Sequence, residues 1–360
     1  MILLSQKIYN WFDERYRISA VRDFLSKKTV PLHRHFVWYY FGGVTLFLFI
    51  VQVVTGILLL FYYKPTASEA YESVKFIMTK VEFGWLIRSI HSWSANLMVF
   101  SAFVHLFSTF FMKSYRPPRE VTWVTGAFMF FIVMGMGFTG YLLPWNELSF
   151  FATKVGTQIA GAVPVLGSYL KVMLRGGQEI SDATITRFFA LHVMVLPIVA
   201  AAFLGLHLTM IQLQGTSEPL SQISNPDKDS IKFFPNFILR DIIVWLLILV
   251  ALLALSVMFP WELGKKADPF VSTPPGIKPE WYFVWMFQTL KIIPARILFF
   301  DGEVFGILGF GLAGFALVMI PFIDIWSRKE KRNPILAILG VCAILYILLM
   351  TYLAYFGPQK

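Results

Sequence analysis

The chain has 360 residues, of which 57% are hydrophobic and only 14% are charged, with a mean hydropathy of +0.65. These values exclude an ordinary soluble domain, in which about 45–50% of residues are apolar and about 25% are charged. The net charge of +10 does not indicate nucleic-acid binding, because the basic residues flank long apolar stretches, where they meet lipid head groups.

Seven stretches free of charged residues are long enough to span a bilayer, which takes about 20 helical residues. In chain order they are Phe36–Tyr63, Ser89–Met112, Val121–Asn146, Phe188–Ser217, Ile242–Trp261, Val304–Ile323 and Asn333–Gln359. Two shorter stretches, Val155–Leu170 and Trp281–Leu290, are interpreted as loop helices at the surface. The sequence predicts an all-α integral membrane protein with about seven transmembrane helices.

The topology follows from the flanking charges. The first span is too long for a cleavable signal and follows about 35 polar, mixed-charge residues, so the N-terminus is predicted to be cytoplasmic. Two short loops then face the cytoplasm and carry the basic residues that the positive-inside rule requires. These residues are Lys113, Arg116, Arg119, Arg328, Lys329, Lys331 and Arg332. The predicted units are a four-helix module over 1–215, a polar linker over 216–236 and a three-helix module over 237–360.

Four of the six histidines lie inside predicted spans, where ionisable residues are costly and usually functional. His91 and His105 lie 14 residues apart in the second span, about 21 Å along a helix and within roughly 40° of one face. His192 and His207 lie 15 residues apart in the fourth span, within roughly 60° of one face. The two spans cross in the same direction, so His91 pairs with His192 near the far side and His105 with His207 near the cytoplasm.

Two neutral imidazoles fill both axial positions of a haem iron, which suits electron transfer rather than oxygen binding. The pairs therefore predict two non-covalent haems that carry electrons across the membrane. Helix packing or proton relay is the alternative, but four histidines at matched spacing favour haem. The single cysteine, Cys342, lies in the last span, which excludes a CxxCH haem attachment and a four-cysteine iron–sulfur site.

Glycines and arginines accompany the histidines. Four glycines in the first and third spans repeat the 14-residue step and would allow a flat macrocycle to approach the backbone. They are Gly42, Gly56, Gly126 and Gly140. Small-residue helix packing would explain either pair alone. Arg88 and Arg187, at the far-side ends of their spans, are candidate partners for haem propionates or arginines that extend to the membrane surface.

Five motifs carry a family resemblance. They are RSIHSWSAN around His91, GYLLPWNELSF from Gly140, TRFFALH ending in His192, FFPNFILRD ending in Asp241 and PPGIKPEWYF around Glu280. Together they resemble cytochrome b, the core subunit of bc1 and b6f quinol-oxidising complexes, over nearly the whole chain. The spacing of His192 and His207 and the seven spans resemble a cytochrome b6 module, a four-helix dihaem bundle, fused to a subunit IV module.

The resemblance implies the catalytic core subunit of a quinol:cytochrome c, or similar acceptor, oxidoreductase. One electron from quinol would go to a Rieske-type iron–sulfur protein and on to a c-type cytochrome subunit. The other would cross through two b-type haems to a cytoplasmic quinone site, contributing to proton translocation by a Q-cycle. The resemblance also implies a homodimeric complex in a bacterial cytoplasmic membrane.

The resemblance also assigns quinone sites. In the family, the loop formed here by Pro279, Glu280, Trp281 and Tyr282 lines the quinol-oxidation pocket, and its glutamate accepts a quinol proton. Glu280 and Tyr282 are therefore the catalytic candidates.

Asp241 and Gln212 fall where relatives place residues around a cytoplasmic quinone; a solvated charge at the end of a span is the alternative for Asp241. The chain departs from the b6 pattern in WYYFGG, which has Tyr40 near the place of a haem-attaching cysteine. Ser108 and Gln212 stand where relatives have arginines near the cytoplasmic haem.

Two other functions fit the histidines alone. A dihaem anchor subunit of a dehydrogenase needs the histidine pairs but no PEWY loop. A transporter or proton channel would use intramembrane histidines without haem. Reducible b-type absorbance would exclude the second.

Overall fold

The computed structural model describes residues 2–219, 229–274, 276–297, 299–325 and 334–358. Within these ranges, seven helices are long and apolar enough to cross a membrane, and each overlaps one predicted stretch. The spans are Phe36–Leu60, Gly84–Phe111, Glu120–Tyr141, Asp182–Gln214, Phe233–Met258, Gly302–Ile323 and Pro334–Phe356. The prediction of an all-α membrane protein is confirmed.

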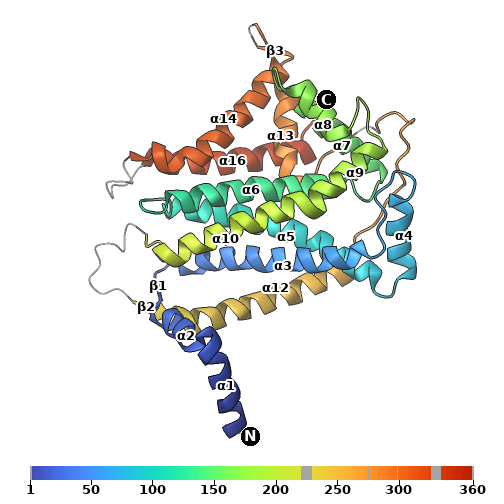
Figure 1. The fold of residues 1–360 in the computed structure, drawn as a ribbon. Helices are drawn as coiled ribbons and strands as arrows, with labels where there is room; N and C mark the ends of the chain where they lie inside the picture. Colours follow the sequence, from blue (N-terminus) through green and yellow to red (C-terminus); the bar gives the residue numbers. More distant parts are fainter. Residues whose placement is uncertain (1, 220–228, 275, 298, 326–333, 359–360) are drawn as a thin grey trace.

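The first four spans are built from α3 (Tyr40–Leu60), α5 (Gly84–Phe111), α6 (Glu120–Tyr141) and α10 (Leu196–Gln214). The last three are α12 (Ile238–Met258), α14 (Gly302–Ile323) and α16 (Pro334–Phe356). Three short segments extend spans at their starts: η1 (Phe36–Tyr39) before α3, α9 (Asp182–Ala190) with the π-turn η2 (Leu191–Val195) before α10, and η3 (Phe233–Phe237) before α12. The long helices lie side by side in Figure 1.

The remaining elements lie before or between the spans. They are the helices α1 (Ile2–Tyr16), α2 (Ile18–Lys27), α4 (Ala70–Lys80), α7 (Glu147–Gly161), α8 (Gly167–Arg175) and α13 (Trp281–Ile292). Two antiparallel strand pairs complete the described chain: β1 (Thr29–Pro31) with β2 (Ser230–Lys232), and β3 (Arg296–Ile297) with β4 (Phe300–Asp301).

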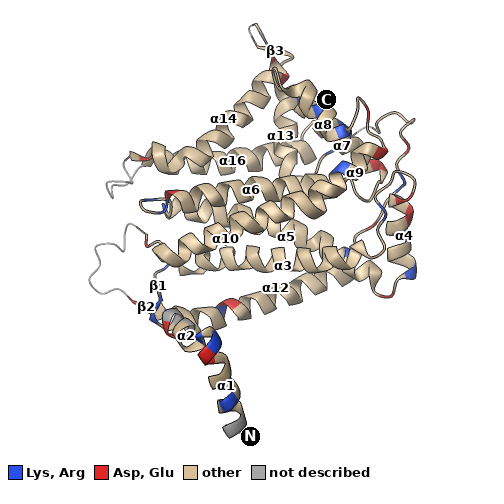
Figure 2. Ribbon diagram, in the orientation of Figure 1, with Lys and Arg blue, Asp and Glu red and all other residues tan. Residues whose placement is uncertain are grey.

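The spans pack in pairs around a shared core. Helix α3 lies along α5, α6 lies along α10, and α12 covers α3 and α5. The core at their centre includes Leu48, Met98, Val133 and Leu252, all buried. Figure 2 shows that charged residues gather at the two ends of the bundle and leave the middle of the spans almost free of charge. This distribution is the one a bilayer imposes, because charged side chains are costly in hydrocarbon.

The two shorter apolar stretches are helical, but one does not lie at the surface. Helix α13 buries Tyr282 and Val284, and Tyr282 belongs to the same core as Leu48. The expected surface position of Trp281–Leu290 is therefore wrong. This stretch is apolar on every side, WYFVWMFQTL, and a short helix without a polar face gains more from packing into the bundle than from lying at the interface.

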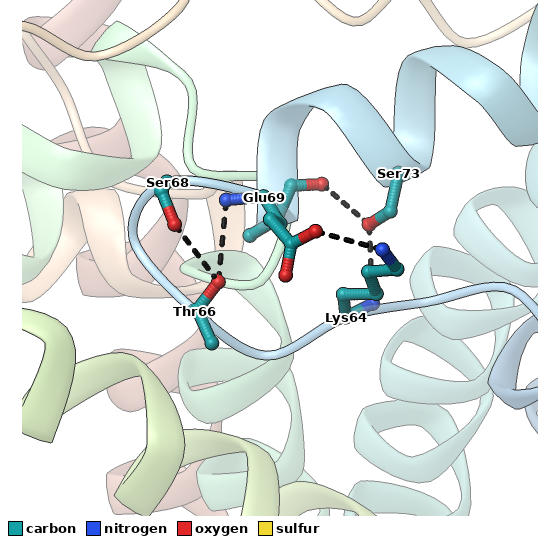
Figure 3. A network of polar contacts seen from close by, with 6 residues as sticks. Lys64, Thr66, Ser68, Glu69 and Ser73 are labelled. Carbon is teal, nitrogen blue, oxygen red and sulfur yellow. Dashed lines mark hydrogen bonds and ion pairs between the residues drawn. The ribbon is translucent and has the colours of Figure 1, made fainter.

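Polar contacts order the connections on both sides of the bundle. Figure 3 shows the loop between α3 and α4, where the Lys64 ammonium lies 2.7 Å from Glu69 and Ser73 Oγ accepts from the Lys64 backbone N–H at 3.2 Å. At the other end, Lys113 Nζ lies 2.9 Å from the fully buried Asp324 carboxylate. That pair joins α5 to the end of α14. The predicted basic residues Arg328, Lys329, Lys331 and Arg332 lie outside the described residues.

Candidate functional site

The far-side histidines face each other across two helices. His91 on α5 and His192 on η2 have ring centroids 6.3 Å apart and ring planes at 78°. His192 lies in a π-turn, a local widening of the helix that often occurs at functional sites. His105 on α5 and His207 on α10 are near enough to interact electrostatically. The structure thus brings together the same two pairs that the sequence predicts.

Each of the four glycines lies against one histidine ring. A Cβ atom at Gly42 would lie 3.1 Å from His105, at Gly56 3.4 Å from His91 and at Gly126 3.2 Å from His207. At Gly140 it would lie 2.5 Å from His192, which is closer than real Cβ contacts. The glycines therefore make room for the imidazoles, a contact that the sequence interpretation assigned to the macrocycle.

The Nδ1 atoms of three of the four histidines have partners that suit metal ligation. Nδ1 of His91 lies 2.9 Å from Thr55 Oγ1, Nδ1 of His207 lies 3.0 Å from Thr125 Oγ1, and Nδ1 of His192 lies 2.9 Å from the Met136 carbonyl. A histidine held through Nδ1 presents Nε2 to a metal. The paired imidazoles, the absent Cβ atoms and the three oriented Nδ1 groups would suit two haems, each held by one pair of histidines.

The two candidate propionate partners bind backbone groups. The Arg88 guanidinium is buried and donates to the Trp261 carbonyl at 2.5 Å. The Arg187 guanidinium donates to the Met173 carbonyl at 2.6 Å and to the Val172 carbonyl at 3.1 Å. Both arginines therefore join the ends of spans to neighbouring segments. Their role toward propionates stays a prediction.

A cavity of about 360 Å³ lies between α6, α7 and α13 and is lined by Pro279, Glu280 and Tyr282 of the predicted quinol loop. Burial raises the pKa of Glu280 to about 6. Burial, with Glu280 nearby, also raises the pKa of Tyr282. The partly buried carboxyl group is therefore poised to take up a proton close to neutral pH.

Two residues that the sequence interpretation did not name line this cavity, and the role of Trp281 at a quinol site stays a prediction. Gly137 and Tyr141 also line it, and a Cβ atom at Gly137 would lie 2.6 Å from the Tyr282 hydroxyl. Trp281 lines a different cavity of about 880 Å³ between α5, α13 and α16, and its indole N–H donates to Asn96 Oδ1 at 2.7 Å. No local pattern marks Gly137, because its contact with Tyr282 joins segments far apart in the sequence.

The residues predicted near a cytoplasmic quinone or haem have the following contacts. The Asp241 carboxylate lies against Gly43, and its Oδ1 atom is buried with no hydrogen-bond partner among the described residues. Gln212 Oε1 accepts from Lys28 Nζ at 2.6 Å. Tyr40 stacks on Phe237 with centroids 5.2 Å apart. Ser108 donates to the His105 carbonyl at 2.9 Å, within its own helix.

Seven membrane spans around two pairs of facing histidines define a haem-binding, electron-transporting membrane protein. Residues 25–215 match the family model described as Cytochrome b/b6/petB, and residues 266–360 match Cytochrome b(C-terminal)/b6/petD. The chain belongs to the cytochrome b family.

Three similar proteins illustrate the relationship. A cytochrome bc complex cytochrome b subunit of Chlorobaculum thiosulfatiphilum is 48% identical over 350 residues, 97% of this chain and 81% of the relative. Cytochrome b6 of Synechococcus elongatus is 48% identical over 214 residues, 59% of this chain and 99% of the relative. One chain in a solved structure of a hyperthermophilic respiratory Complex III matches with a TM-score of 0.84 at 28% sequence identity. The match covers 97% of this chain and 91% of the chain in that structure.

Proposed function

We propose that the chain is the cytochrome b subunit of a bc-type quinol-oxidising complex that contributes to proton translocation by a Q-cycle. The single observation that carries this proposal is the combination, in one bundle, of two histidine pairs with a pocket lined by Glu280. A dihaem anchor subunit would need the histidine pairs alone, and a proton channel would need neither haem nor pocket.

Two b-type haems, held without covalent attachment by His91 with His192 and His105 with His207, would supply the one-electron carriers. The chain's own part is to hold the four imidazoles in facing pairs and to exclude water between the helices. Cys342 is exposed on α16, far along the chain from every ligand, and takes no part.

Quinol would bind in the cavity beside Glu280 and Tyr282. Oxidation of a quinol releases two electrons and two protons, and the protons need an acceptor inside an apolar pocket. Glu280 would accept one of them, because its raised pKa still leaves it ionised at neutral pH. At the cytoplasmic side, Asp241 and Gln212 would bind the quinone that receives the electrons. Asp241 would pass a proton to this quinone as it is reduced, and its buried Oδ1 atom would accept a hydrogen bond from a hydroxyl group of the quinol that forms.

The proposal also covers the modules of the chain, its partner subunits and its place in the membrane. Its units would be a b6-like module over 1–215, a linker over 216–236 and a subunit IV-like module over 237–360. Partner subunits would be a Rieske-type iron–sulfur protein and a c-type cytochrome in a homodimeric complex. The complex would lie in the bacterial cytoplasmic membrane with the N-terminus in the cytoplasm and the Glu280 pocket on the far side.

The test is the haem content and quinol oxidation of the intact complex purified from its native membrane. We expect two b-type haems per copy of this chain, reducible by quinol, and no haem stain on this band after denaturing electrophoresis. A complex without b-type absorbance would contradict the proposal. A stained band would contradict only the non-covalent attachment.

A further inference from the structure

Three of the four histidines share one local arrangement. The residue directly before the glycine that faces the ring is a threonine: Thr55 for His91, Thr125 for His207 and Thr139 for His192. The threonine Oγ1 atoms lie 2.9 Å, 3.0 Å and 3.5 Å from the respective Nδ1 atoms. One Thr-Gly dipeptide thus makes room for the ring and places an oxygen beside its Nδ1.

The hydroxyl protons of these threonines are already engaged. Thr55 Oγ1 donates to the Val51 carbonyl at 2.6 Å, Thr125 to Val121 at 3.0 Å and Thr139 to Gly135 at 2.8 Å. A hydroxyl has a single proton, so toward the imidazole the oxygen acts as an acceptor. Nδ1 must then carry the ring proton, and Nε2 keeps its lone pair.

His192 has a second acceptor that leads to the same tautomer. Its Nδ1 atom lies 2.9 Å from the Met136 carbonyl, which can only accept. Thr139 is therefore the more distant of two acceptors, and its loss should matter less than the loss of Thr55.

His105 is the exception. Phe41 precedes its glycine, Gly42, and His105 Nδ1 is buried with no hydrogen-bond partner among the described residues. The Phe41 carbonyl already accepts from Thr45 Oγ1 at 2.8 Å and from Ser101 Oγ at 3.2 Å. The far-side pair thus has an acceptor on both imidazoles, and the cytoplasmic pair has an acceptor on one.

We propose that Thr55, Thr125 and Thr139 are positioning residues that fix the tautomer of three haem histidines, and that Phe41 leaves His105 without this contact. The inference rests on the proposed function, because it takes the four histidines as iron ligands. An acceptor at Nδ1–H makes the imidazole a stronger donor through Nε2, which favours the oxidised iron. Removing the acceptor should raise the reduction potential of that haem alone.

The first experiment is a redox titration of both haems in the purified complex, followed by absorbance, with each haem assigned from variants of its histidines. Thr55→Val should raise the reduction potential of the far-side haem by up to about 59 mV. For one electron this shift corresponds to about a tenfold change in the ratio of reduced to oxidised haem at a fixed potential. Thr55→Ser, which keeps the hydroxyl, should restore the original value. Thr45→Val is the matched control, because Thr45 bonds Phe41 and Ser101 rather than His91.

The second experiment adds the missing acceptor. Phe41→Thr should lower the potential of the cytoplasmic haem, whereas Phe41→Val, which loses the same ring without gaining a hydroxyl, should not. This arm tests the inference even if Thr55→Val fails to assemble.

Unchanged potentials in Thr55→Val with both haems bound, or equal effects of Thr55→Val and Thr55→Ser, would overturn the inference and leave the proposed function intact. Equal effects of Phe41→Thr and Phe41→Val would overturn it as well. Absence of b-type absorbance from the unmodified complex would instead overturn the proposed function.

Discussion

The two ends of the bundle differ in how completely the chain itself satisfies the polar groups of the candidate site residues. At the end predicted to face away from the cytoplasm, His91 and His192 both have Nδ1 acceptors, Arg88 is bound by carbonyl groups, and Glu280 lines a cavity. At the opposite end, predicted to face the cytoplasm, His105 Nδ1 and Asp241 Oδ1 are buried without hydrogen-bond partners among the described residues. An unsatisfied buried polar atom costs about 1–3 kcal/mol. The candidate residues named at the first end are therefore already paired within the chain, whereas His105 and Asp241 at the second end keep hydrogen-bonding capacity for a ligand.

The largest expected effect comes from the glycine that faces His192. In Gly140→Ala the new Cβ atom would lie 2.5 Å from the ring, so His192 must move and we expect most of the far-side haem to be lost. In Gly56→Ala the corresponding distance to His91 is 3.4 Å, an ordinary contact, and haem content should stay near normal. Haem spectra of the two purified variants check this contrast. Equal haem loss in both would show that the distances to the rings do not govern binding.

The next effect concerns proton acceptance at the far side. Loss of a general base typically costs about 10²- to 10⁴-fold, but water or a neighbouring group can substitute, so Glu280→Gln should lose less turnover than that. The pKa of Glu280 is raised to about 6, so activity that needs its ionised form should fall as the pH drops through 6. The variant should lack this acid limb and keep normal haem content.

Quinol oxidation measured across pH, with the exposed Glu82→Gln as the control, tests this expectation. Full activity of Glu280→Gln with an unchanged pH profile would remove Glu280 from the proton path and leave it a structural part of the pocket.

A smaller and more selective effect is expected at the cytoplasmic side. Asp241→Asn should slow reoxidation of the cytoplasmic haem while leaving the initial reduction of the haems by quinol intact, because an asparagine side chain cannot pass a proton to the quinone as it is reduced. Flash or stopped-flow absorbance separates the two phases. The exposed Asp23→Asn variant, on the same side of the molecule, is the control. An unchanged rate of haem reoxidation in Asp241→Asn would show that Asp241 is only a charged residue at the end of a span.

The sequence predicts the spans well because lipid requires long uninterrupted apolar helices. The span ends are less predictable. The second span begins at Gly84 rather than Ser89, since Arg88 is buried by its bonds to carbonyl groups instead of marking the membrane boundary. Charge alone could not reveal those bonds, which join residues more than 170 positions apart.

In the candidate site, too, some features could be predicted from the sequence and others could not. Histidine spacing along α5 and α10 is a property of single helices, so the pairs could be predicted from the sequence. The burial of α13, the contact of Gly137 with Tyr282 and the orphan nitrogen of His105 depend on how helices pack against each other. The threonines before three of the glycines were visible in the sequence, but their meaning required the distances to the rings.

The most direct test of the account is the identity of the haem lost when each histidine is replaced. The predicted result is that His91→Leu and His192→Leu each remove the same far-side haem, while His105→Leu and His207→Leu each remove the other. His35→Leu, outside the four ligands, should keep both. Reduced-minus-oxidised spectra and redox titration of the purified complexes identify the haem that remains. Loss of different haems in His91→Leu and His192→Leu would contradict the pairing and, with it, the path for electrons across the membrane.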